Sequence, residues 1–368
     1  MLFIPISQLK GGMKLADDVL VFERSNVRLL KKGSPLSQKY IDGLIRFGVS
    51  GVYVKDEVTG DIMPSAPVID TKTKTKTLQN LEWIYNSSTE TEKKNNKSYI
   101  KNIDNTVVEL MKLIRESKEN SINISDLKAY DEYTYHHSLS VAVISIGLGM
   151  QLGLSEDELH KLGFGAIMHD IGKMNIPREI INKPGKLTEY EFGEMKKHSL
   201  YSEAYLQDNA IDDPEIYNSV MAHHEKVDGT GYPFGLKDKD IHLYAKIMSV
   251  ADVYDALTSS RPYRDPEVPT MVAEYIMGNC GIAFDMDVVR SFISKIEFFP
   301  VGSFVELSNG KKAIVVENRK SRLRPVVKEV EPPFKTMDLF DDKSVYDIVI
   351  TKLYEETPYS TLMKLGIG

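Results

Sequence analysis

The sequence has almost no cysteine and no surplus of positive charge. Cys280 is the only cysteine among 368 residues, which excludes an internal disulfide and a thiolate metal cluster and fits a reducing cytoplasm. The chain carries 46 Lys and Arg against 53 Asp and Glu, and this balance argues against a dedicated nucleic-acid binder. A small phosphate ligand stays compatible with it, because a few local cations or a metal outweigh the net charge.

The sequence also lacks a long apolar run. Its longest apolar stretch, "VAVISIGLGM" at 141–150, is far shorter than a membrane span. The first residues, "MLFIPISQLKGG", show no basic segment followed by a long apolar one, so no signal peptide is predicted. We therefore expect a cytoplasmic protein with no membrane partner.

The amino-terminal part of the chain predicts a small module and then a linker. Residues 1–63 combine short strand patterns with a helix over "SQKYIDGLIRFGV", which indicates an α+β accessory module. Residues 64–98 contain "TKTKTKT" and "NSSTETEKKNNKS", whose low complexity is typical of a polar linker. The apolar segment "LEWIYN", with the only tryptophan, Trp83, is expected to dock on a neighbour.

The rest of the chain predicts a mainly α fold with a β-rich end. Residues 99–299 follow the helical period, and Ser155 with Glu158 and Thr188 with Glu191 fit capping boxes that open helices. Asp213–Pro214 supplies a helix N-cap followed by a proline at the first helical position. Residues 300–368 are β-rich and include a hairpin through Asn309–Gly310, the dipeptide that type I′ turns prefer.

Five histidines and two aspartates lie beside apolar helical runs, next to polar residues that are not typical of a hydrophobic core. They are His137, His169, Asp170, His198, His223, His224 and Asp252. Imidazole and carboxylate without thiolate suit divalent iron, manganese or zinc. Seven such side chains are too many for one ion and suit two ions that share a bridging carboxylate. We expect ordinary structural roles for the remaining histidines, His136, His160 and His242.

The adjacent pair His223–His224 predicts the end of a helix. Neighbouring side chains on a helix point about 100° apart, so two adjacent ligands reach one ion only where the helix stops. The loop that follows, "EKVDGTGYP", supplies that stop: Gly229 and Gly231 permit a tight backbone, Pro233 stiffens it, and the Tyr232 ring is offered for stacking or partner contact.

Two motifs give the chain a family resemblance. "HDIGK" at 169–173 matches the His-Asp signature of the HD phosphohydrolases, and "HHEKVDGTGYP" at 223–233 matches the motif that names the HD-GYP class. The segments "YTYHHS", "NKPGKLTEYEF", "AKIMSVADVYDALTSSRPYR" and "FDMDVV" also resemble that class and stand in its usual order. The resemblance covers residues 125–299 and implies an HD-type helical bundle that hydrolyses the bacterial second messenger cyclic di-GMP to pGpG, or on to GMP, with a metal cluster.

The resemblance also implies how the ligands divide. One ion would be held by His137, His169, Asp170 and Asp252, and the other by His198, His223 and His224, with Asp170 bridging. Some members of the class hold a third ion with a glutamate four residues before the first histidine, where this chain has Tyr133, next to Glu132. We therefore expect two divalent ions, iron or manganese, with a third left open, and pGpG as the main product.

Three cationic side chains are candidates for phosphate binding. Lys173 comes four residues after His169 and would share its helical face if the helix continues. Its ammonium could then bind a nonbridging phosphate oxygen, while the cations turn a bridging water into hydroxide. Arg261 and Arg264 follow Asp252 and offer guanidinium forks that match phosphate and guanine.

Two other functions remain open at this stage. The chain could be another HD-superfamily phosphohydrolase, such as a nucleotidase or an enzyme for a different cyclic dinucleotide, although the GYP loop argues against an ordinary nucleotidase. It could also be a cyclic-dinucleotide receptor or scaffold whose output is protein contact, although an intact ligand set disfavours this. The resemblance implies diguanylate cyclase domains as partners of the GYP loop, and a homodimer is also left open.

Overall fold

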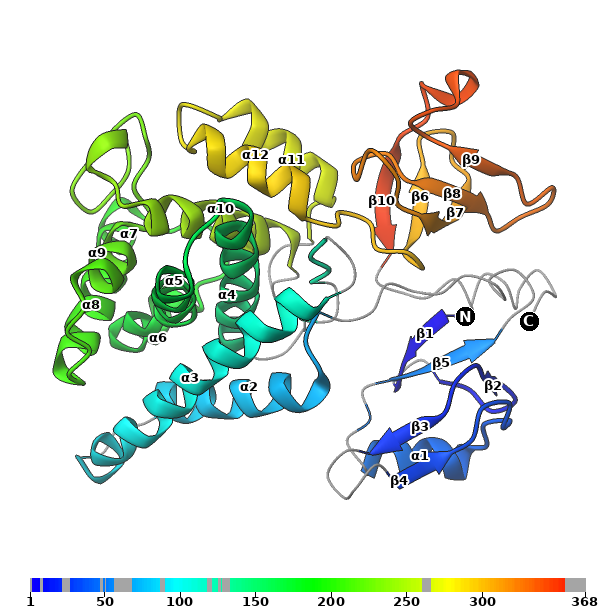
Figure 1. Ribbon diagram of the computed structural model, residues 1–368, viewed down its shortest axis with the longest axis horizontal. Helices are drawn as coiled ribbons and strands as arrows, with labels where there is room; N and C mark the ends of the chain where they lie inside the picture. Colours follow the sequence, from blue (N-terminus) through cyan, green and yellow to red (C-terminus); the bar gives the residue numbers. More distant parts are fainter. Residues whose placement is uncertain are drawn as a thin grey trace. The chain divides into compact units, whose positions relative to one another are not determined.

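The computed structural model describes most of the chain in two compact units. The described residues are 2–6, 9–21, 27–46, 49, 51–55, 68–86, 90–117, 121–124, 127, 133–259 and 266–354. One unit joins Met1–Ala66 with Phe298–Gly368, and the other is Pro67–Glu297 (Figure 1). None of the described helices has the length and apolar character that crossing a membrane requires.

The second unit is helical, as its sequence period predicts. Its elements are α2 (Thr71–Asn86), α3 (Glu90–Glu116), α4 (Tyr133–Gln151), α5 (Glu156–Met168), η3 (Ile171–Asn175), α6 (Arg178–Ile181), α7 (Glu189–Lys196), α8 (His198–Asp208), α9 (Pro214–Ala222), η4 (Asp238–Asp240), α10 (Leu243–Thr258), α11 (Pro269–Gly278) and α12 (Met286–Lys295). Both predicted capping boxes are present, at Ser155 and Thr188, and Asp213 caps α9 ahead of a proline at the first helical position. The prediction of a mainly α fold is confirmed.

Helix α4 forms the centre of this unit. It packs against α5, α10, α12, α3 and α2, and its apolar side chains from Leu139 to Leu148 are fully buried. A helix that is apolar on all sides belongs inside a protein, surrounded by other helices. Helices α5 and α10 flank α4, so the polar side chains that these three helices carry are brought together inside the bundle (Figure 1).

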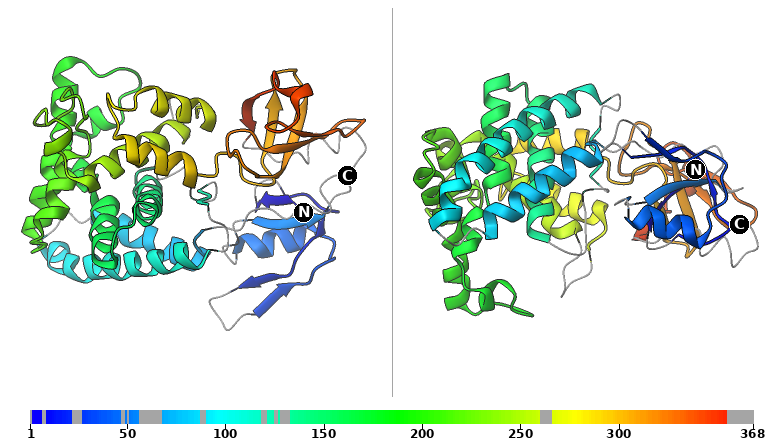
Figure 2. Two further views of the ribbon diagram at one scale, coloured as in Figure 1. Left: turned by 45° about the horizontal axis from the view of Figure 1, so that its top comes forward. Right: turned by 90° about the horizontal axis from the view of Figure 1, so that it is seen from below.

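The predicted linker is helical over most of its length. Helix α2 occupies residues 71–86, and α3 begins at Glu90, inside the range expected to be unstructured. Helices α2 and α3 lie side by side (Figure 2). Leu81 and Ile84 of α2 are fully buried, and the Trp83 ring stacks on Tyr99 of α3 with ring centroids 3.8 Å apart. The expectation that "LEWIYN" docks is confirmed. The linker interpretation is wrong for these residues, because a few buried apolar side chains outweigh a polar composition.

The first unit is built from both ends of the chain. Its elements are β1 (Leu2–Pro5), β2 (Lys14–Leu15), β3 (Val19–Val21), β4 (Val27–Leu30), α1 (Gln38–Arg46), β5 (Gly51–Lys55), β6 (Phe304–Leu307), β7 (Lys312–Glu317), β8 (Val326–Glu329), β9 (Thr336–Asp338), η5 (Lys343–Val345) and β10 (Ile350–Tyr354). They form antiparallel sheets in the orders β1-β5-β2, β3-β4 and β10-β6-β7-β8-β9.

The two ends of the chain share one hydrophobic core. Ile4, Leu44 and Val54 from the amino-terminal part pack in one cluster with Phe304 and Ile314 of the carboxy-terminal sheet. The sequence predicts two separate modules here, because nothing in the local patterns links residues about 300 positions apart. The structure instead groups them in one unit.

The hairpin predicted at Asn309–Gly310 is present, but with a different turn. Strands β6 and β7 pair antiparallel, with Phe304 opposite Ile314 and Val305 opposite Ala313. A type I′ turn needs a positive φ at both central residues, whereas here Gly310 has φ 79° and Asn309 does not have a positive φ. The Gly310 N–H donates to the Leu307 carbonyl at 2.8 Å, so the connection is a three-residue loop that ends in a left-handed glycine.

Candidate metal centre

The seven predicted ligands come from five helical segments, and most of them stand at helix ends. His137 lies in α4 and Asp252 in α10. His169 is the C-cap of α5 and Asp170 the next residue, His198 opens α8, and His223 is the C-cap of α9 with His224 after it. The helix end expected at His223–His224 is therefore present. Where a helix stops, the backbone changes direction, and two adjacent side chains can reach the same space.

One set of ligands, here called the aspartate group, gathers around Asp170. It consists of His137, His169, Asp170 and Asp252. In the first three of these, potential ligand atoms all lie within 4.8 Å of one another. The Nε2 of His137 lies 3.5 Å from Asp170 Oδ2 and 3.1 Å from Asp252 Oδ1, and His169 Nε2 lies 3.4 Å from Asp170 Oδ2. This spacing could hold a metal ion between imidazole nitrogens and carboxylate oxygens.

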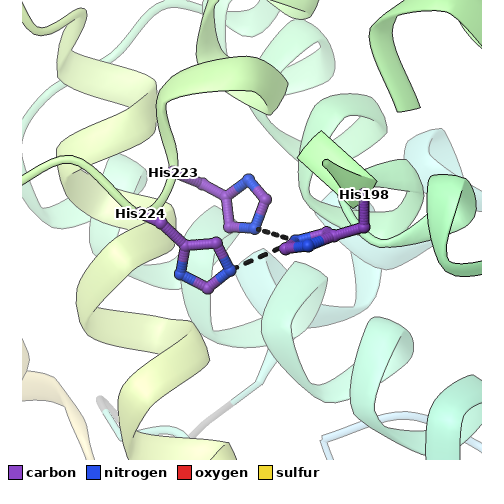
Figure 3. Close-up of side chains that lie close together, drawn as sticks. All are labelled: His198, His223 and His224. Atoms are coloured by element: carbon purple, nitrogen blue, oxygen red, sulfur yellow. Dashed lines mark hydrogen bonds between the residues drawn. The ribbon is translucent and has the colours of Figure 1, made fainter. Parts of the chain in front are cut away.

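The second set, here called the imidazole group, consists of His198, His223 and His224. His223 and His224 point from the end of α9 toward the His198 ring, as Figure 3 shows. The Nε2 of His198 lies 3.4 Å from His223 Nε2 and 3.2 Å from His224 Nε2. Their ligand atoms also lie within 4.8 Å of one another, so this group could hold a second ion.

The two aspartates connect the groups. Asp170 places Oδ2 beside His137 and His169, while its Oδ1 lies 3.4 Å from His198 Nε2. Asp252 places Oδ1 beside His137 and Oδ2 at 3.7 Å from His224 Nδ1. A carboxylate that faces both groups with different oxygens is suited to bridging two ions.

Hydrogen bonds to Nδ1 fix the orientation of four of the five rings. The Nδ1 atoms of His169, His198 and His223 lie 2.8, 2.7 and 2.5 Å from the carbonyl oxygens of Ala166, Met195 and Val220. His137 Nδ1 lies 2.7 Å from Asp255 Oδ2 instead. When Nδ1 of a neutral ring donates its hydrogen in this way, Nε2 keeps a lone pair for a metal.

Asp255 is a functional candidate that the sequence analysis did not single out. Its carboxylate is buried and holds the ring of His137. The signal was present in "ADVYDALTS", because Asp255 stands three residues after Asp252 and shares its helical face. Asp252 alone is predicted as a ligand, because only Asp252 matches a ligand position of the family that the sequence resembles.

The buried atoms of this cluster fit a metal better than an ordinary polar core. His169 Nε2 and Asp170 Oδ1 are buried and have no hydrogen-bond partner among the described residues. Leaving such groups unpaired costs about 1–3 kcal/mol each, so a folded protein pairs them or uses them to bind. A mixed set of imidazole nitrogens and carboxylate oxygens suits the divalent iron, manganese or zinc that the sequence predicts.

The electrostatics differ between the two groups. Burial lowers the pKa of His198, His223 and His224, to about 3 for His224, so these rings are neutral at pH 7. Burial would also lower the pKa of His137, but hydrogen bonds and negative charge from Asp252 and Asp255 outweigh it and raise this pKa to about 9.

Asp170 is an anion in spite of its burial. Burial alone would raise its pKa, but Lys173 and the nearby His169 and His198 hold this pKa well below its usual range. Lys173 lies in η3, because α5 ends at Met168, so the expected continuous helical face is absent. Its ammonium instead forms an ion pair with Asp170 Oδ2, and its side chain is 28% exposed.

The loop after His224 is held by a second residue that the sequence analysis missed. The buried carboxylate of Glu225 accepts hydrogen bonds from the N–H groups of Phe234, Gly235 and Leu236 at 2.7, 3.1 and 3.0 Å. A side chain at Gly231 would meet Glu225 Cα at 2.4 Å, so this close approach requires glycine. The loop stacks the Tyr232 ring on His224, with ring centroids 4.7 Å apart and an angle of 28° between the ring planes.

The other residues singled out in the sequence lie either outside the cluster or outside the described part of the chain. His136, His160 and His242 lie outside the cluster: His136 contacts the Leu127 carbonyl, His160 contacts Asp104, and His242 caps α10. Arg261, Arg264 and Glu132 lie outside the described residues, and of Tyr133 only the position at the start of α4 is described. The phosphate contacts expected of the two arginines therefore stay predictions.

Comparison with known proteins agrees with this geometry. Residues 111–288 match the model of the HD domain family. A cyclic di-GMP phosphodiesterase of Pseudomonas aeruginosa is 40% identical over 210 residues, which are 56% of this chain and 50% of the relative. A cyclic di-GMP phosphodiesterase of Thermotoga maritima is 35% identical over 164 residues, 44% of this chain and 45% of the relative.

A third relative acts on a different cyclic dinucleotide. The 3′3′-cGAMP-specific phosphodiesterase 1 of Vibrio cholerae is 39% identical over 142 residues, which are 39% of this chain and 32% of the relative. The chain thus spans half or less of the length of these curated relatives. The matched region contains every residue of both ligand groups, and we conclude that residues 111–288 of this chain are similar to the HD domain family.

Proposed function

We propose that the chain hydrolyses cyclic di-GMP to linear pGpG at this centre, with two divalent ions, iron or manganese, as cofactors. The observation that carries the proposal is the position of Asp170. Its two oxygens face different ligand groups, at 3.4 Å from His169 on one side and 3.4 Å from His198 on the other. The names of two relatives, both cyclic di-GMP phosphodiesterases, support the choice of substrate.

We assign the ligands according to the two groups. His137, His169, Asp170 and Asp252 would hold one ion, and His198, His223 and His224 the other, with Asp170 shared. When bound, two such ions activate a water molecule as the nucleophile and neutralise charge on the phosphate that is attacked.

The chain's own residues supply orientation and charge. Asp255 and the three backbone carbonyls keep the Nε2 atoms of four of the five histidines directed at the cluster. Asp170 stays anionic and therefore able to bind cations at neutral pH. We assign to Lys173 the binding of a nonbridging phosphate oxygen, because its partly exposed ammonium already lies against Asp170.

A second candidate substrate is 3′3′-cGAMP. The relative that is specific for it shares 39% identity with this chain, about as much as the relatives named for cyclic di-GMP. The two substrates differ in one purine base and carry the same phosphodiester backbone. The choice between them therefore depends on contacts to the bases rather than on the ligand groups.

The test is hydrolysis by protein purified without oxygen and loaded with iron or manganese. Elemental analysis counts and identifies the ions, and chromatography follows cyclic di-GMP and 3′3′-cGAMP separately. We expect two ions per chain, faster loss of cyclic di-GMP, and pGpG as the product that accumulates. Tight nucleotide binding without turnover of either compound, or of a chromogenic phosphodiester, would identify a receptor instead.

We also propose that the loop after His224 meets diguanylate cyclase domains. Phe234 follows Tyr232 in this loop and is 55% exposed, which leaves an apolar ring available to a partner. Binding of purified diguanylate cyclase domains to the wild-type chain and to Phe234→Ser, measured by calorimetry, tests this. Equal binding by both proteins, or binding by neither, would contradict the proposal.

A further inference from the structure

Beside the imidazole group lies an aromatic and cationic surface that the ligand assignment does not use. It consists of Phe192, Lys196 and Tyr232, here called the shelf. Phe192 and Lys196 stand four residues apart on α7, the helix that ends just before His198, so they share one helical face. Tyr232 belongs to the loop that follows His223 and His224.

The three side chains contact one another and reach the cluster. The Tyr232 ring stacks on His224 and meets Phe192 edge to face, with ring centroids 6.2 Å apart at 79°. The ammonium of Lys196 lies 4.7 Å from the centre of the Phe192 ring and 5.2 Å from that of Tyr232. A continuous path of rings thus leads from a proposed ligand to the protein surface.

The shelf is held in place from both sides. Thr188 and Glu191 close the capping box that starts α7, and Glu191 also pairs with Lys183. On the other side, Glu225 anchors the backbone directly after Tyr232 and Pro233. The position of the rings is therefore set before any ligand arrives, which reduces the entropic cost of binding.

Packing alone does not account for this arrangement. Phe192 is 45% exposed, so much of its ring contributes nothing to a hydrophobic core. Flat rings beside a cation are suited to a ligand that is itself flat and anionic, as a nucleotide is.

We propose that the shelf binds one purine base of the substrate. The base stacks on the exposed ring of Phe192, and Lys196 attracts the phosphate that is not being cleaved. Tyr232 joins this subsite to His224, so that a stacked base fixes the other phosphate over the ligand groups. The inference rests on the proposed function and adds to it the residues that recognise a base.

The test compares two substrates and two positions on α7. Phe192→Ala and Lys196→Ala are assayed on cyclic di-GMP and on methyl p-nitrophenyl phosphate, a small diester without a base. Stacking of one base is worth about 1–3 kcal/mol, so Phe192→Ala should raise KM for cyclic di-GMP roughly 5- to 150-fold. The KM for the small diester, the metal content and kcat should change less than about twofold, and Phe192→Trp should restore KM.

A matched control stands on the same helix. Tyr190 is 75% exposed and lies two positions from Phe192, on another face, so Tyr190→Ala should leave both KM values unchanged. The inference is overturned if Phe192→Ala leaves KM for cyclic di-GMP unchanged, or if it impairs both substrates equally. The proposed function fails separately, when the wild-type protein turns over no cyclic dinucleotide at all.

Discussion

The aspartate group and the imidazole group are suited to binding a cation in opposite ways. In the aspartate group, buried carboxylates surround the histidines, and the hydrogen bonds that His137 donates to Asp252 and Asp255 raise its pKa to about 9 in spite of burial. In the imidazole group, three rings lie against one another, and burial lowers all three pKa values. One group attracts a cation with negative charge, and the other keeps its nitrogens unprotonated.

This difference shows how a buried site can bind cations without strong repulsion among its own charged groups. Carboxylates at every ligand position would repel one another strongly at low dielectric. The three imidazoles of the imidazole group take three of the seven ligand positions without adding charge, because burial keeps them unprotonated. Asp170 then serves both groups, since its two oxygens face different sides.

The largest effect should come from the residue that the groups share. Asp170→Ala removes the oxygens facing both His169 and His198, so we expect metal to be lost from both groups and hydrolysis to fall at least about a thousandfold. Elemental analysis and hydrolysis assays measure the two effects. Asp287→Ala, an exposed change on α12, serves as the control. Full metal content in Asp170→Ala would refute the sharing.

A smaller effect, confined to one group, is expected at Asp255. Asp255→Asn removes the negative charge that orients His137, and losing such an outer contact costs about 10- to 100-fold in metal affinity. We expect a chelator to remove one ion at a lower concentration than in the wild type and the second ion at an unchanged concentration. Equal weakening of both ions would show that the groups are not distinct.

The substitution Gly172→Ala tests the close backbone contact between η3 and α8. A side chain there would lie 2.1 Å from the His198 carbonyl oxygen and 2.4 Å from the Ser202 nitrogen, so Gly172→Ala must push α8 away from η3. We expect the free energy of unfolding to fall by about 1–3 kcal/mol, measured by chemical denaturation.

The control for this change is Gly193→Ala. Gly193 has no atom within 4 Å of an added side chain and lies inside α7, where alanine is favoured by about 0.5–1 kcal/mol. If Gly172→Ala proved as stable as the wild type, the contact between η3 and α8 would not be as tight as the structure indicates.

The smallest effect concerns acid stability near the imidazole group. An ion pair with Lys183 and the N–H of Thr188 lower the pKa of Glu191 to about 2 from 4.5. Because the folded pKa is the lower one, this carboxylate stabilises α7 above pH 4.5, and its contribution is lost as the pH falls toward 2. Glu191→Gln should therefore lower the Tm slightly at pH 7.

At pH 3 the same substitution should lower the Tm by less than at pH 7. Glu189→Gln, a change in the same first turn of α7, is the matched control and should show a smaller loss of Tm at pH 7. A difference between Glu191→Gln and the wild type that grew as the pH fell would contradict the assignment. Thermal unfolding followed by circular dichroism at both values measures it.

The elements that sequence patterns predicted well are those with local causes. The capping boxes at Ser155 and Thr188 depend on residues three positions apart, and the helix end at His223 depends on the loop directly after it. The type I′ turn that Asn309–Gly310 favours is absent, although the two strands predicted on either side of it are present. Strand pairing tolerates several loop geometries, and the dipeptide alone does not choose among them.

The contacts that sequence patterns missed join distant parts of the chain. The residues of helix α2 were predicted to be a linker because most of them are polar. The buried apolar side chains Leu81 and Ile84 are few among them. Asp255 lies 118 residues from His137, so its contact with that ring could not be inferred from spacing alone.

The sequence by itself determined the kinds of ligand atom, the helices that carry them and the loop that ends α9, because these follow from residue type and short-range spacing. Only the tertiary structure decided which oxygen of Asp170 faces which group, which rings are charged, and that Phe192 lies beside Tyr232. Distances and burial arise when helices pack, and they set the local dielectric and the neighbours of each charge.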